Sequence, residues 1–370
     1  MELSPKTLVV DARLIKASGI GTDIQNLIPY LKNSYQITLL GDPSELSKYA
    51  WAANLEIIKF RKPIYSVAEQ LLLPLLVPSC DFFLSPHFNV PVLPVKAKQR
   101  IVIIHDVFHL AATHISRIHK MYAKFLLQSA LNFSDKIITI SEFSRSEIIK
   151  YLHVGSKELH KISLGVDHQL YRQSHHAWLV EEVKAKYNLP PAYILFVGNV
   201  KPHKNLQNLV IALSKLCSAT FADLKLVIVG KKEGFITGDT TLKKLIEDLH
   251  LTQRVIFTGF VENEHLPVIY AYAKVFVFPS LYEGFGLPPL EAMAAGCPTI
   301  VSDAASMPEV CQDACYYIHA NDPNQIVHAI SEVLTNFPLR QTLISKGEAL
   351  AKEYNWEKAA GELHRIIQLQ

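Results

Sequence analysis

The sequence VFVFPSLYEGFGLPPLEAMA, residues 275–294, joins an apolar run to a helix-forming run through a glycine-rich loop. Val275–Pro279 is apolar at consecutive positions, as expected of a strand that helices cover on both faces. The paired prolines after the loop suit the first turn of a helix, where their missing amide protons leave no bond unmade. Strand, loop and helix in this order form the repeating unit of a parallel α/β sheet. The loop carries one carboxylate, Glu283, and the helix carries a second, Glu291.

The same alternation of short apolar runs and helical patterns extends in both directions from this stretch. The expected strands are Thr7–Val10, Gln36–Leu40, Asp81–Ser85, Arg100–His105, Lys136–Ile140, Ala192–Gly198, Lys225–Gly230, Arg254–Gly259, Val275–Pro279 and Pro298–Ser302. A charged helical pattern stops at tandem prolines, Pro190 and Pro191, directly before a new first strand. The pattern therefore predicts the α/β class with two Rossmann-like domains, residues 1–188 and 189–353. A final helix, residues 354–370, is expected to pack back on the first domain.

The composition is that of a globular protein with two cores. A chain of 370 residues exceeds the size at which a single core stops growing, and 49% hydrophobic against 19% charged residues exclude a disordered chain. The five cysteines are scattered without a paired CxxC, which disfavours a disulfide framework or structural zinc and favours a reducing cytoplasm. We expect neither a secretory signal nor a membrane-spanning segment, because no apolar run approaches about 18 residues.

The charge of the chain is unevenly distributed. The net charge of +3 is too small to indicate nucleic acid as a partner. Residues 96–161 hold eleven Lys and Arg against five Asp and Glu, a local charge of +6. Two interpretations stay open: an ordinary basic surface, or a face drawn to anionic lipid or to a phosphorylated acceptor. The apolar segments Tyr65–Leu76 and Pro86–Leu93 also fit two interpretations, a buried core or loops that dip into a bilayer.

A second glycine-rich loop follows the first strand, at the edge where ligands bind in open α/β sheets. Ser18–Gly21 has the sequence SGIG and precedes a helical pattern, so its amides and the helix N-terminus suit a phosphate. A plain tight turn explains the same residues. A dehydrogenase is an alternative class, but it requires a third glycine where this chain has Ile24, and it leaves Glu283 and Glu291 without a role.

The residues from Glu283 to Glu291 resemble the paired-glutamate signature of glycosyltransferase family 4. Further segments similar to motifs of that family are Val197–Leu206, Phe257–Val261, Val301–Asp303 and Pro308–Val310. The N-terminal segments that resemble its bacterial mannosyltransferase and rhamnosyltransferase branch are Ser18–Gly21, Ile104–Val107 and Ile140–Ser144. The resemblance implies the GT-B fold, in which two Rossmann-like domains with parallel sheets face an interdomain cleft. It also implies transfer with retention of the anomeric configuration.

The resemblance further implies a set of site residues. The catalytic roles fall to His105, Glu283 and Lys204. The donor-binding roles fall to Gly19, Gly21, Asn199, Lys204, Phe260, Val261, Glu283, Gly284, Phe285, Gly286, Leu287 and Glu291. Glu291 would bind the ribose hydroxyls, Glu283 the transferred sugar, and Lys204 the diphosphate as it leaves. His105 would lie near the anomeric carbon, with its neighbour Asp106 orienting the ring.

The basic loop of the second domain departs from the family pattern. Asn199 stands where many relatives have an arginine, so the positive charge comes from Lys204 alone or from Lys204 with His203 or Arg254. No metal and no cofactor are expected, because the chain lacks an Asp-x-Asp motif. The histidines of the first domain that fit no familiar ligand spacing are His105, His109, His114 and His119.

The function expected from these residues is metal-independent transfer of a hexose from a nucleotide sugar to a glycan or lipid-linked saccharide. Resemblance to the bacterial branch favours mannose from GDP-mannose, in the synthesis of a surface polysaccharide such as lipopolysaccharide. A UDP-hexose or dTDP-rhamnose donor is an alternative. A non-catalytic or epimerase relative with the GT-B fold is another, which the intact Lys204, Glu283 and Glu291 disfavour. The expected location is the cytoplasm, with peripheral contact at the inner face of the cytoplasmic membrane left open.

Overall fold

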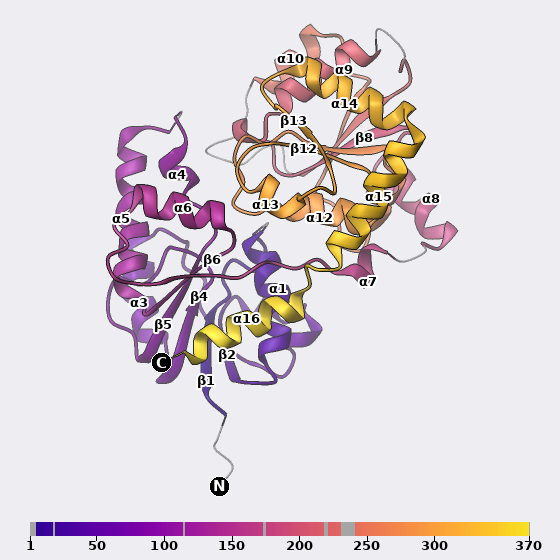
Figure 1. The fold of residues 1–370 in the computed structure, drawn as a ribbon. Helices are drawn as coiled ribbons and strands as arrows, with labels where there is room; N and C mark the ends of the chain where they lie inside the picture. The colour runs from indigo at the N-terminus through magenta and orange to yellow at the C-terminus, as the bar shows by residue number, and fades with distance from the viewer. Residues whose placement is uncertain are drawn as a thin grey trace. The chain divides into compact units, whose positions relative to one another are not determined.

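The computed structural model describes residues 5–17, 19–113, 115–172, 175–217, 221–230 and 241–369. Within these residues the chain forms two compact units, both drawn in Figure 1. Unit 1 comprises Met1–Gly165 together with Trp356–Gln370, and unit 2 comprises Val166–Asn355. Ser18 and His114, which the sequence analysis names, lie outside the described residues.

Unit 1 is built on a parallel sheet with the strand order β3-β2-β1-β4-β5-β6-β7. Its strands are β1 (Thr7–Asp11), β2 (Gln36–Gly41), β3 (Glu56–Lys59), β4 (Cys80–Ser85), β5 (Ala97–Ile104), β6 (Lys136–Thr139) and β7 (Leu159–Lys161). Its helices are α1 (Ile20–Leu31), α2 (Pro43–Leu46), α3 (Val67–Leu76), α4 (Phe108–Ala111), α5 (Arg117–Phe133), α6 (Glu142–Tyr151) and α16 (Trp356–Gln368). The C-terminal helix α16 packs against α1.

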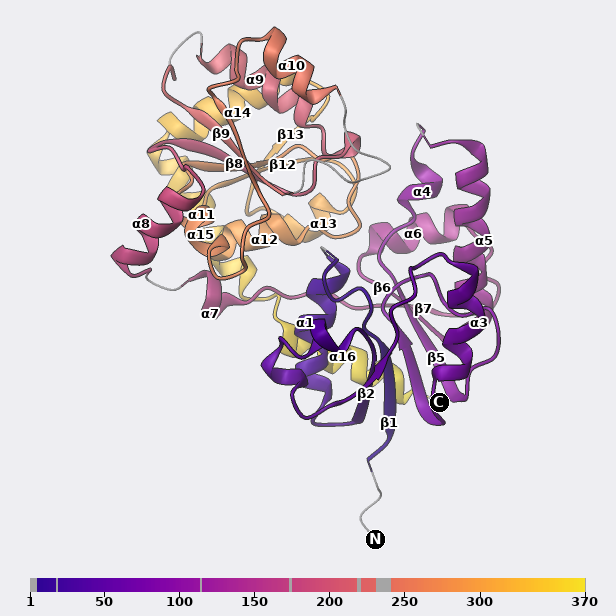
Figure 2. The ribbon, with the colours of Figure 1, turned by 180° about the vertical axis from the view of Figure 1, so that it is seen from behind.

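Unit 2 is built on a second parallel sheet with the order β10-β9-β8-β11-β12-β13, seen from behind in Figure 2. Its strands are β8 (Tyr193–Val197), β9 (Lys225–Val229), β10 (Val255–Gly259), β11 (Val275–Phe278), β12 (Thr299–Ser302) and β13 (Tyr316–Ile318). Its helices are α7 (His168–Tyr171), α8 (Ala177–Lys186), α9 (Leu206–Cys217), α10 (Leu242–Asp248), α11 (Leu266–Tyr272), α12 (Leu287–Ala294), α13 (Met307–Cys311), α14 (Pro323–Thr335) and α15 (Phe337–Ala351).

The two Rossmann-like sheets confirm the expected fold class, and each of the ten expected strands forms with its ends shifted by at most three residues. The strands β3, β7 and β13 were not expected. Each is three or four residues long and lies at the edge of its sheet. All three are short, and β3 and β7 contain charged residues, so none of them has an apolar run long enough to identify a buried strand.

The division between the units falls after Gly165, earlier than the expected junction after Asn188. The helices α7 and α8 occupy the interval between these positions, and both pack against α11 of unit 2. The tandem prolines therefore precede the first strand of the second sheet without marking the boundary. Sequence pattern identifies the strand, but the packing partner of the preceding helices decides the unit to which they belong.

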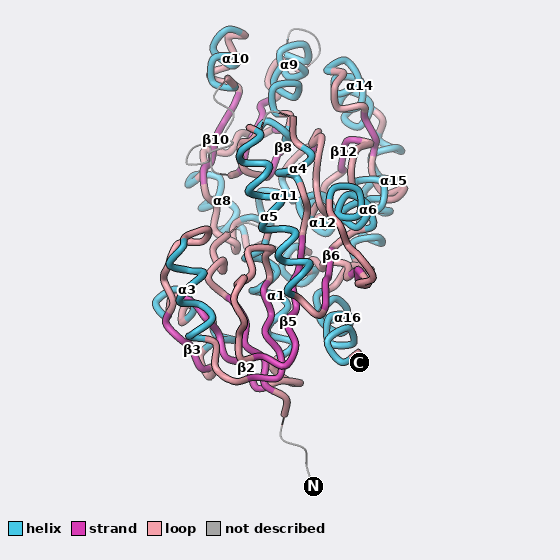
Figure 3. The backbone as a smooth tube through the Cα atoms, turned by 90° about the vertical axis from the view of Figure 1, so that its left-hand side faces the viewer, coloured by secondary structure: helices cyan, strands magenta, loops and turns pink. Residues whose placement is uncertain are grey.

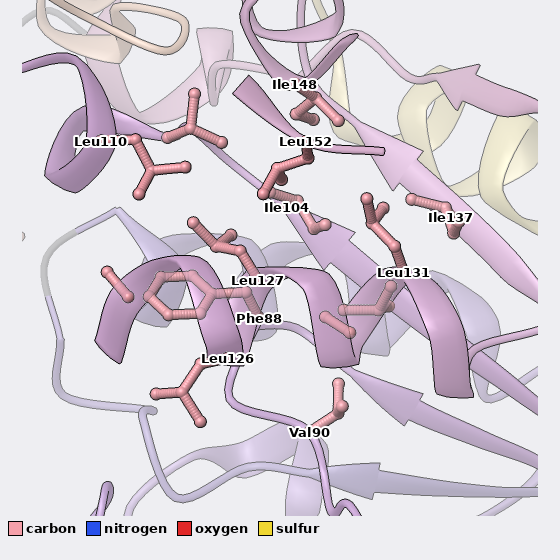
Figure 4. Packing of buried hydrophobic residues seen from close by; sticks show 14 of the residues in the cluster. Phe88, Val90, Ile104, Leu110, Leu126, Leu127, Leu131, Ile137, Ile148 and Leu152 are labelled. Carbon is pink, nitrogen blue, oxygen red and sulfur yellow. The ribbon is translucent and has the colours of Figure 1, made fainter. Parts of the chain in front are cut away.

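The helices α3 and α5 cover the same face of the unit 1 sheet. The register places Val9 beside Phe83 and Phe83 beside Arg100. Neighbours in parallel register point the same way and residues two apart share a face, so Val102 faces the side of Val9. Leu73 of α3 packs into a cluster with Val9 and Phe83, and α5 packs into a second cluster that contains Val102, shown in Figure 4.

Candidate functional site

The loops after β8 and β11 lie together at the carboxyl edge of the unit 2 sheet, where ligands bind in such folds. Asn205 ends the basic loop in a left-handed conformation, with a φ of 58°. Its side-chain amide donates to the carbonyls of Pro279 and Ala320 at 3.1 and 2.7 Å. These buried bonds tie the basic loop to the end of β11, which brings Lys204 to Glu283.

Lys204 and Glu283 form an ion pair with Nζ 2.5 Å from Oε1. Their side chains are only 16% and 13% exposed, and Lys204 Nζ also lies 5.2 Å from the centroid of the Phe278 ring. Charges withdrawn from water interact strongly because solvent screens them little. The pair therefore holds one cation and one carboxylate in fixed positions at the edge of the sheet.

Residues at the start of α13 contact the glycine-rich loop and fix its conformation. Gly286 has a φ of 110°, and a Cβ at this position would overlap the Met307 side chain. Ser306 Oγ lies 3.0 Å from the carbonyl oxygen of Glu283 and 2.7 Å from that of Phe285. Helix α12 begins directly after Gly286. Its next two residues, Pro288 and Pro289, have no amide proton, so the Leu287 amide and the helix dipole are what favour an anion beside the loop.

Glu291, in the second turn of α12, is bound by two tyrosine hydroxyls. The Tyr270 hydroxyl donates to Oε2 at 2.7 Å, and the Tyr171 hydroxyl donates to the same carboxylate. Burial raises the pKa of Glu291, while the two hydrogen bonds lower it. The residue as a whole is half-buried, and each carboxylate oxygen can accept more than one hydrogen bond, so Glu291 keeps capacity for a ligand. The sequence analysis missed both tyrosines, because neither has a fixed spacing to the glutamate that it contacts.

Unit 2 also holds other residues that we expected to bind the donor. They lie after the ends of β8, β10 and β11 and are Asn199, Phe260, Val261, Gly284 and Leu287. Phe260 is exposed, whereas Val261 is buried. His203 neighbours Lys204 in the basic loop. Arg254 precedes β10 and so lies at the amino edge of the sheet, away from these loops. It therefore does not supplement the charge of Lys204.

The glycines at the start of α1 are required by the backbone. Gly19 has a φ of 77°, and a Cβ on Gly21 would approach the Ile15 carbonyl oxygen to 2.5 Å. The Gly21 amide donates to the Ala17 carbonyl at 2.6 Å, so it is already used within the loop. A tight turn accounts for Gly21, as the sequence analysis allowed, and no free amide of this residue is available for a phosphate.

His105 directly follows β5, and its ring is oriented by Asp23 of α1. His105 Nε2 lies 2.5 Å from Asp23 Oδ2. Ser144 Oγ donates to the His105 carbonyl at 2.7 Å and fixes the backbone. Asp106 accepts the Phe108 amide at 2.9 Å and so caps the next turn. The expectation that Asp106 orients the imidazole is therefore wrong, because Asp23 takes that place.

Asp23 is fully buried, and its Oδ1 has no hydrogen-bond partner among the described residues. It lines a small hollow together with apolar side chains that include Ile24, Leu27 and Ile103. Burial raises the pKa of Asp23, and the neighbouring His105 lowers it. An acidic residue in a first helical turn usually indicates only a favourable dipole contact, so nothing in the sequence distinguishes Asp23 from other such residues.

The expected residues thus gather into two separate clusters. Gly19, Gly21 and His105 belong to unit 1, and the cluster around Lys204 and Glu291 belongs to unit 2. Their meeting across a cleft stays a prediction. Among the described residues, no group of three or more His, Cys, Asp or Glu side chains could hold a metal ion. No helix in that part of the chain is long and apolar enough to cross a membrane.

Comparison with known proteins identifies relatives of the whole chain. The family model described as glycosyl transferases group 1 matches residues 180–350. O-antigen chain mannosyltransferase B of Escherichia coli is 30% identical over 354 residues, which are 93% of this chain and 91% of the relative. Serotype-specific mannosyltransferase WbdA of Escherichia coli is 31% identical over 244 residues, which are 65% of this chain and 29% of that protein.

The fold is also that of solved structures. The structure of Anabaena Alr3699/HepE in complex with UDP-glucose matches with a TM-score of 0.78 at 16% identity, over 97% of this chain and 98% of that chain. At this identity the likeness concerns the fold alone, which is GT-B as expected. Because a relative at 30% identity matches the chain over nearly its full length, the protein belongs to the group 1 glycosyltransferases, glycosyltransferase family 4, and is a glycosyltransferase.

Proposed function

We propose that this glycosyltransferase moves mannose from GDP-mannose to a glycan or lipid-linked saccharide during synthesis of a bacterial surface polysaccharide. The observation that carries the proposal is the cluster at the carboxyl edge of unit 2, where Lys204, Glu283 and Glu291 surround the start of α12. A cation, a helix N-terminus and two carboxylates suit a diphosphate between a ribose and a hexose. Mannose as the sugar is supported by relatives that are mannosyltransferases by name.

In this proposal each charged residue of unit 2 contacts a different part of the donor. Glu291 accepts hydrogen bonds from the ribose diol, while Tyr171 and Tyr270 keep the carboxylate in place. Lys204 binds the diphosphate and Glu283 the hydroxyls of the hexose. The Lys204–Glu283 ion pair places its two members side by side, so the diphosphate and the hexose that they contact are neighbours, as they are in a nucleotide sugar.

The transfer step that we propose retains the configuration at the anomeric carbon. The bond from that carbon to the diphosphate oxygen breaks, and the acceptor oxygen forms its bond on the same face. The acceptor proton passes to the departing phosphate oxygen. Lys204 and the backbone amide of Leu287, the first residue of α12, stabilise the negative charge that develops there, a role worth about 100- to 1000-fold in rate for one donor. His105, held by Asp23, contacts the donor sugar from unit 1.

Other donors remain alternatives. The Alr3699/HepE structure contains UDP-glucose, but its 16% identity supports the fold alone. dTDP-rhamnose fits the same cluster, because a cation and a helix N-terminus recognise a diphosphate and not a base. A relative that binds a nucleotide sugar without transferring it is the second candidate function, and the absence of an arginine at Asn199 is the feature that favours it.

The proposal is tested with purified protein, EDTA and a panel of GDP-, UDP- and dTDP-sugars, following thermal unfolding and slow donor hydrolysis. A donor at one hundred times its dissociation constant should add about 2.7 kcal/mol to the free energy of unfolding. Glu291→Gln should weaken donor binding, and Lys204→Gln should lower hydrolysis by about 100- to 1000-fold. The control is Lys346→Gln, which removes a half-exposed lysine paired with Asp313 outside the cluster.

Stabilisation and metal-free hydrolysis with GDP-mannose, both lost in the two cluster variants and kept in the control, would support the proposal. Stabilisation by a UDP- or dTDP-sugar instead would overturn the mannose assignment and leave the transferase. Binding without hydrolysis and without transfer to any acceptor saccharide would favour the non-catalytic relative.

A further inference from the structure

The outward sides of α3 and α5 carry large apolar side chains that the unit 1 core does not use. On α3 they recur every fourth residue, and on α5 they recur at three- and four-residue intervals, so each set forms one stripe. Residues of this surface that are between 37% and 79% exposed are Val67, Leu71, Leu72, Leu75, Leu76, Ile118, Met121, Tyr122 and Phe125. We call this set the α3–α5 surface.

The two stripes form one surface because both helices lie on the same face of the sheet, and Figure 3 shows them on the same side of unit 1. Tyr65, which directly precedes the N-cap of α3, contacts Tyr122 of α5 with ring centroids 6.5 Å apart. The core sides of these helices are already filled, since Leu73 and Leu127 are fully buried. The segment Tyr65–Leu76 is therefore partly core and partly exposed, so neither of its two sequence interpretations holds for the whole segment.

The charge beside the α3–α5 surface is positive. Between Asp106 and Asp135 the sequence contains no acidic residue, while α5 carries Arg117, Lys120 and Lys124. At 100° per residue, these three cations lie on one flank of the α5 stripe. Lysine is depleted from the cores of protein–protein interfaces, so apolar residues flanked by lysines do not suit a protein partner. Cations beside an apolar stripe instead suit a bilayer, with the apolar side chains below the headgroups and the cations among anionic phosphates.

We infer that the α3–α5 surface binds the surface of an anionic lipid bilayer. Isolated exposed apolar residues are ordinary on soluble proteins, but a contiguous set of this size marks an interaction site. The contact would keep unit 1 at the membrane where a lipid-linked acceptor resides. The inference does not depend on the identity of the donor sugar, and it concerns residues outside both clusters of the candidate site.

The test is flotation of the full chain with phosphatidylcholine vesicles that contain or lack phosphatidylglycerol. Replacing two surface cations, Lys120→Gln with Lys124→Gln, should weaken binding to anionic vesicles by about 25-fold, taking about fivefold for each charge. Replacing two apolar residues, Leu71→Gln with Leu75→Gln, should weaken it by about tenfold or more. The control Phe337→Ser removes an equally exposed apolar residue from unit 2 and should bind as the wild type does.

Thermal unfolding of each variant checks folding, and exposed substitutions should change stability by no more than about 0.5 kcal/mol. The assay contains neither donor nor acceptor, so its result is independent of the proposed transfer. Equal binding to vesicles with and without phosphatidylglycerol, or unchanged binding by both double variants, would overturn the inference. A dimer in sedimentation that the Leu71 and Leu75 substitutions dissociate, with no vesicle binding, would also overturn it and assign the surface to a second copy of the chain.

Discussion

Replacing Asp23 by asparagine should make the protein more stable and less active. Burial is the largest influence on this carboxyl and raises its pKa above the ordinary value of 3.8. A carboxyl whose pKa rises on folding favours the folded state while it is protonated. That contribution is present below the unfolded pKa and is lost as the pH rises through the folded pKa. Ionisation of Asp23 as the pH rises therefore lowers the free energy of unfolding, and a neutral residue of nearly the same shape avoids the cost of the charge.

The magnitude follows from the surroundings of the carboxylate. Asp23 Oδ1 is buried without a partner among the described residues, and an unsatisfied buried polar atom costs about 1–3 kcal/mol. An asparagine keeps an unsatisfied atom but loses the charge, so we expect a gain of about 1 kcal/mol, or roughly 2–4 °C in unfolding temperature. Activity should fall by about 10- to 100-fold, the range found when metal-bound histidines lose the carboxylate that orients them.

The assay combines thermal unfolding at about pH 4 and pH 7.5 with the rate of donor hydrolysis. The stabilisation should be larger at the higher pH, because the wild-type carboxyl becomes more ionised as the pH rises, whereas the asparagine stays neutral. Asp106→Asn is the matched control: it changes a neighbouring aspartate that caps a turn and should leave hydrolysis near the wild-type rate. A variant that is less stable at pH 7.5, or one that hydrolyses donor at the wild-type rate, would refute the reasoning.

Two further predictions concern unit 2. Tyr270→Phe removes a hydrogen bond that lowers the pKa of Glu291, so that pKa should rise further. GDP affinity, measured by calorimetry, should then be lost on acidification at a higher pH than in the wild type; an unchanged pH profile would contradict this role. Gly286→Ala places a side chain at a φ of 110° and against Met307, which should cost about 1–3 kcal/mol in urea unfolding. An unaltered unfolding curve would exclude that strain.

The buried strands were predictable because their physical cause is local. A central parallel strand such as β8 or β11 is covered on both faces, so every residue in it is apolar and the run is visible in the sequence. The edge strand β3 has no such cover, and its two isoleucines stand between a charged residue at each end, Glu56 and Lys59. The unit boundary was not predicted for a similar reason. Local sequence can indicate that α7 and α8 are helices, but their contacts with α11, which lies much later in the sequence, decide that they belong to unit 2.

The same distinction between local and long-range causes applies to the candidate site. Glu283 and Glu291 were identified because a glycine loop and a helix start bracket them in sequence, and family resemblance gave them roles. Their partners came only from the fold. Lys204 reaches Glu283 across 79 positions, and Asp23 reaches His105 across 82. Because Asp106 follows His105 in the sequence, we expected it to orient the imidazole. A residue just after a strand can instead cap the following turn, and Asp106 does so by accepting the Phe108 amide.

Electrostatics distinguish the two clusters in a way that bears on function. In unit 2 every charged member of the central cluster has a matched partner: Lys204 bonds Glu283, and Glu291 accepts two tyrosine hydroxyls. Such pairs are explained by stability alone, since an unpaired buried charge is costly. Asp23 is different, because one of its oxygens is buried without a partner among the described residues. An asparagine at position 23 would have nearly the same shape and would not carry a buried charge. The aspartate is therefore best explained by its contact with His105, the histidine that we expect near the anomeric carbon.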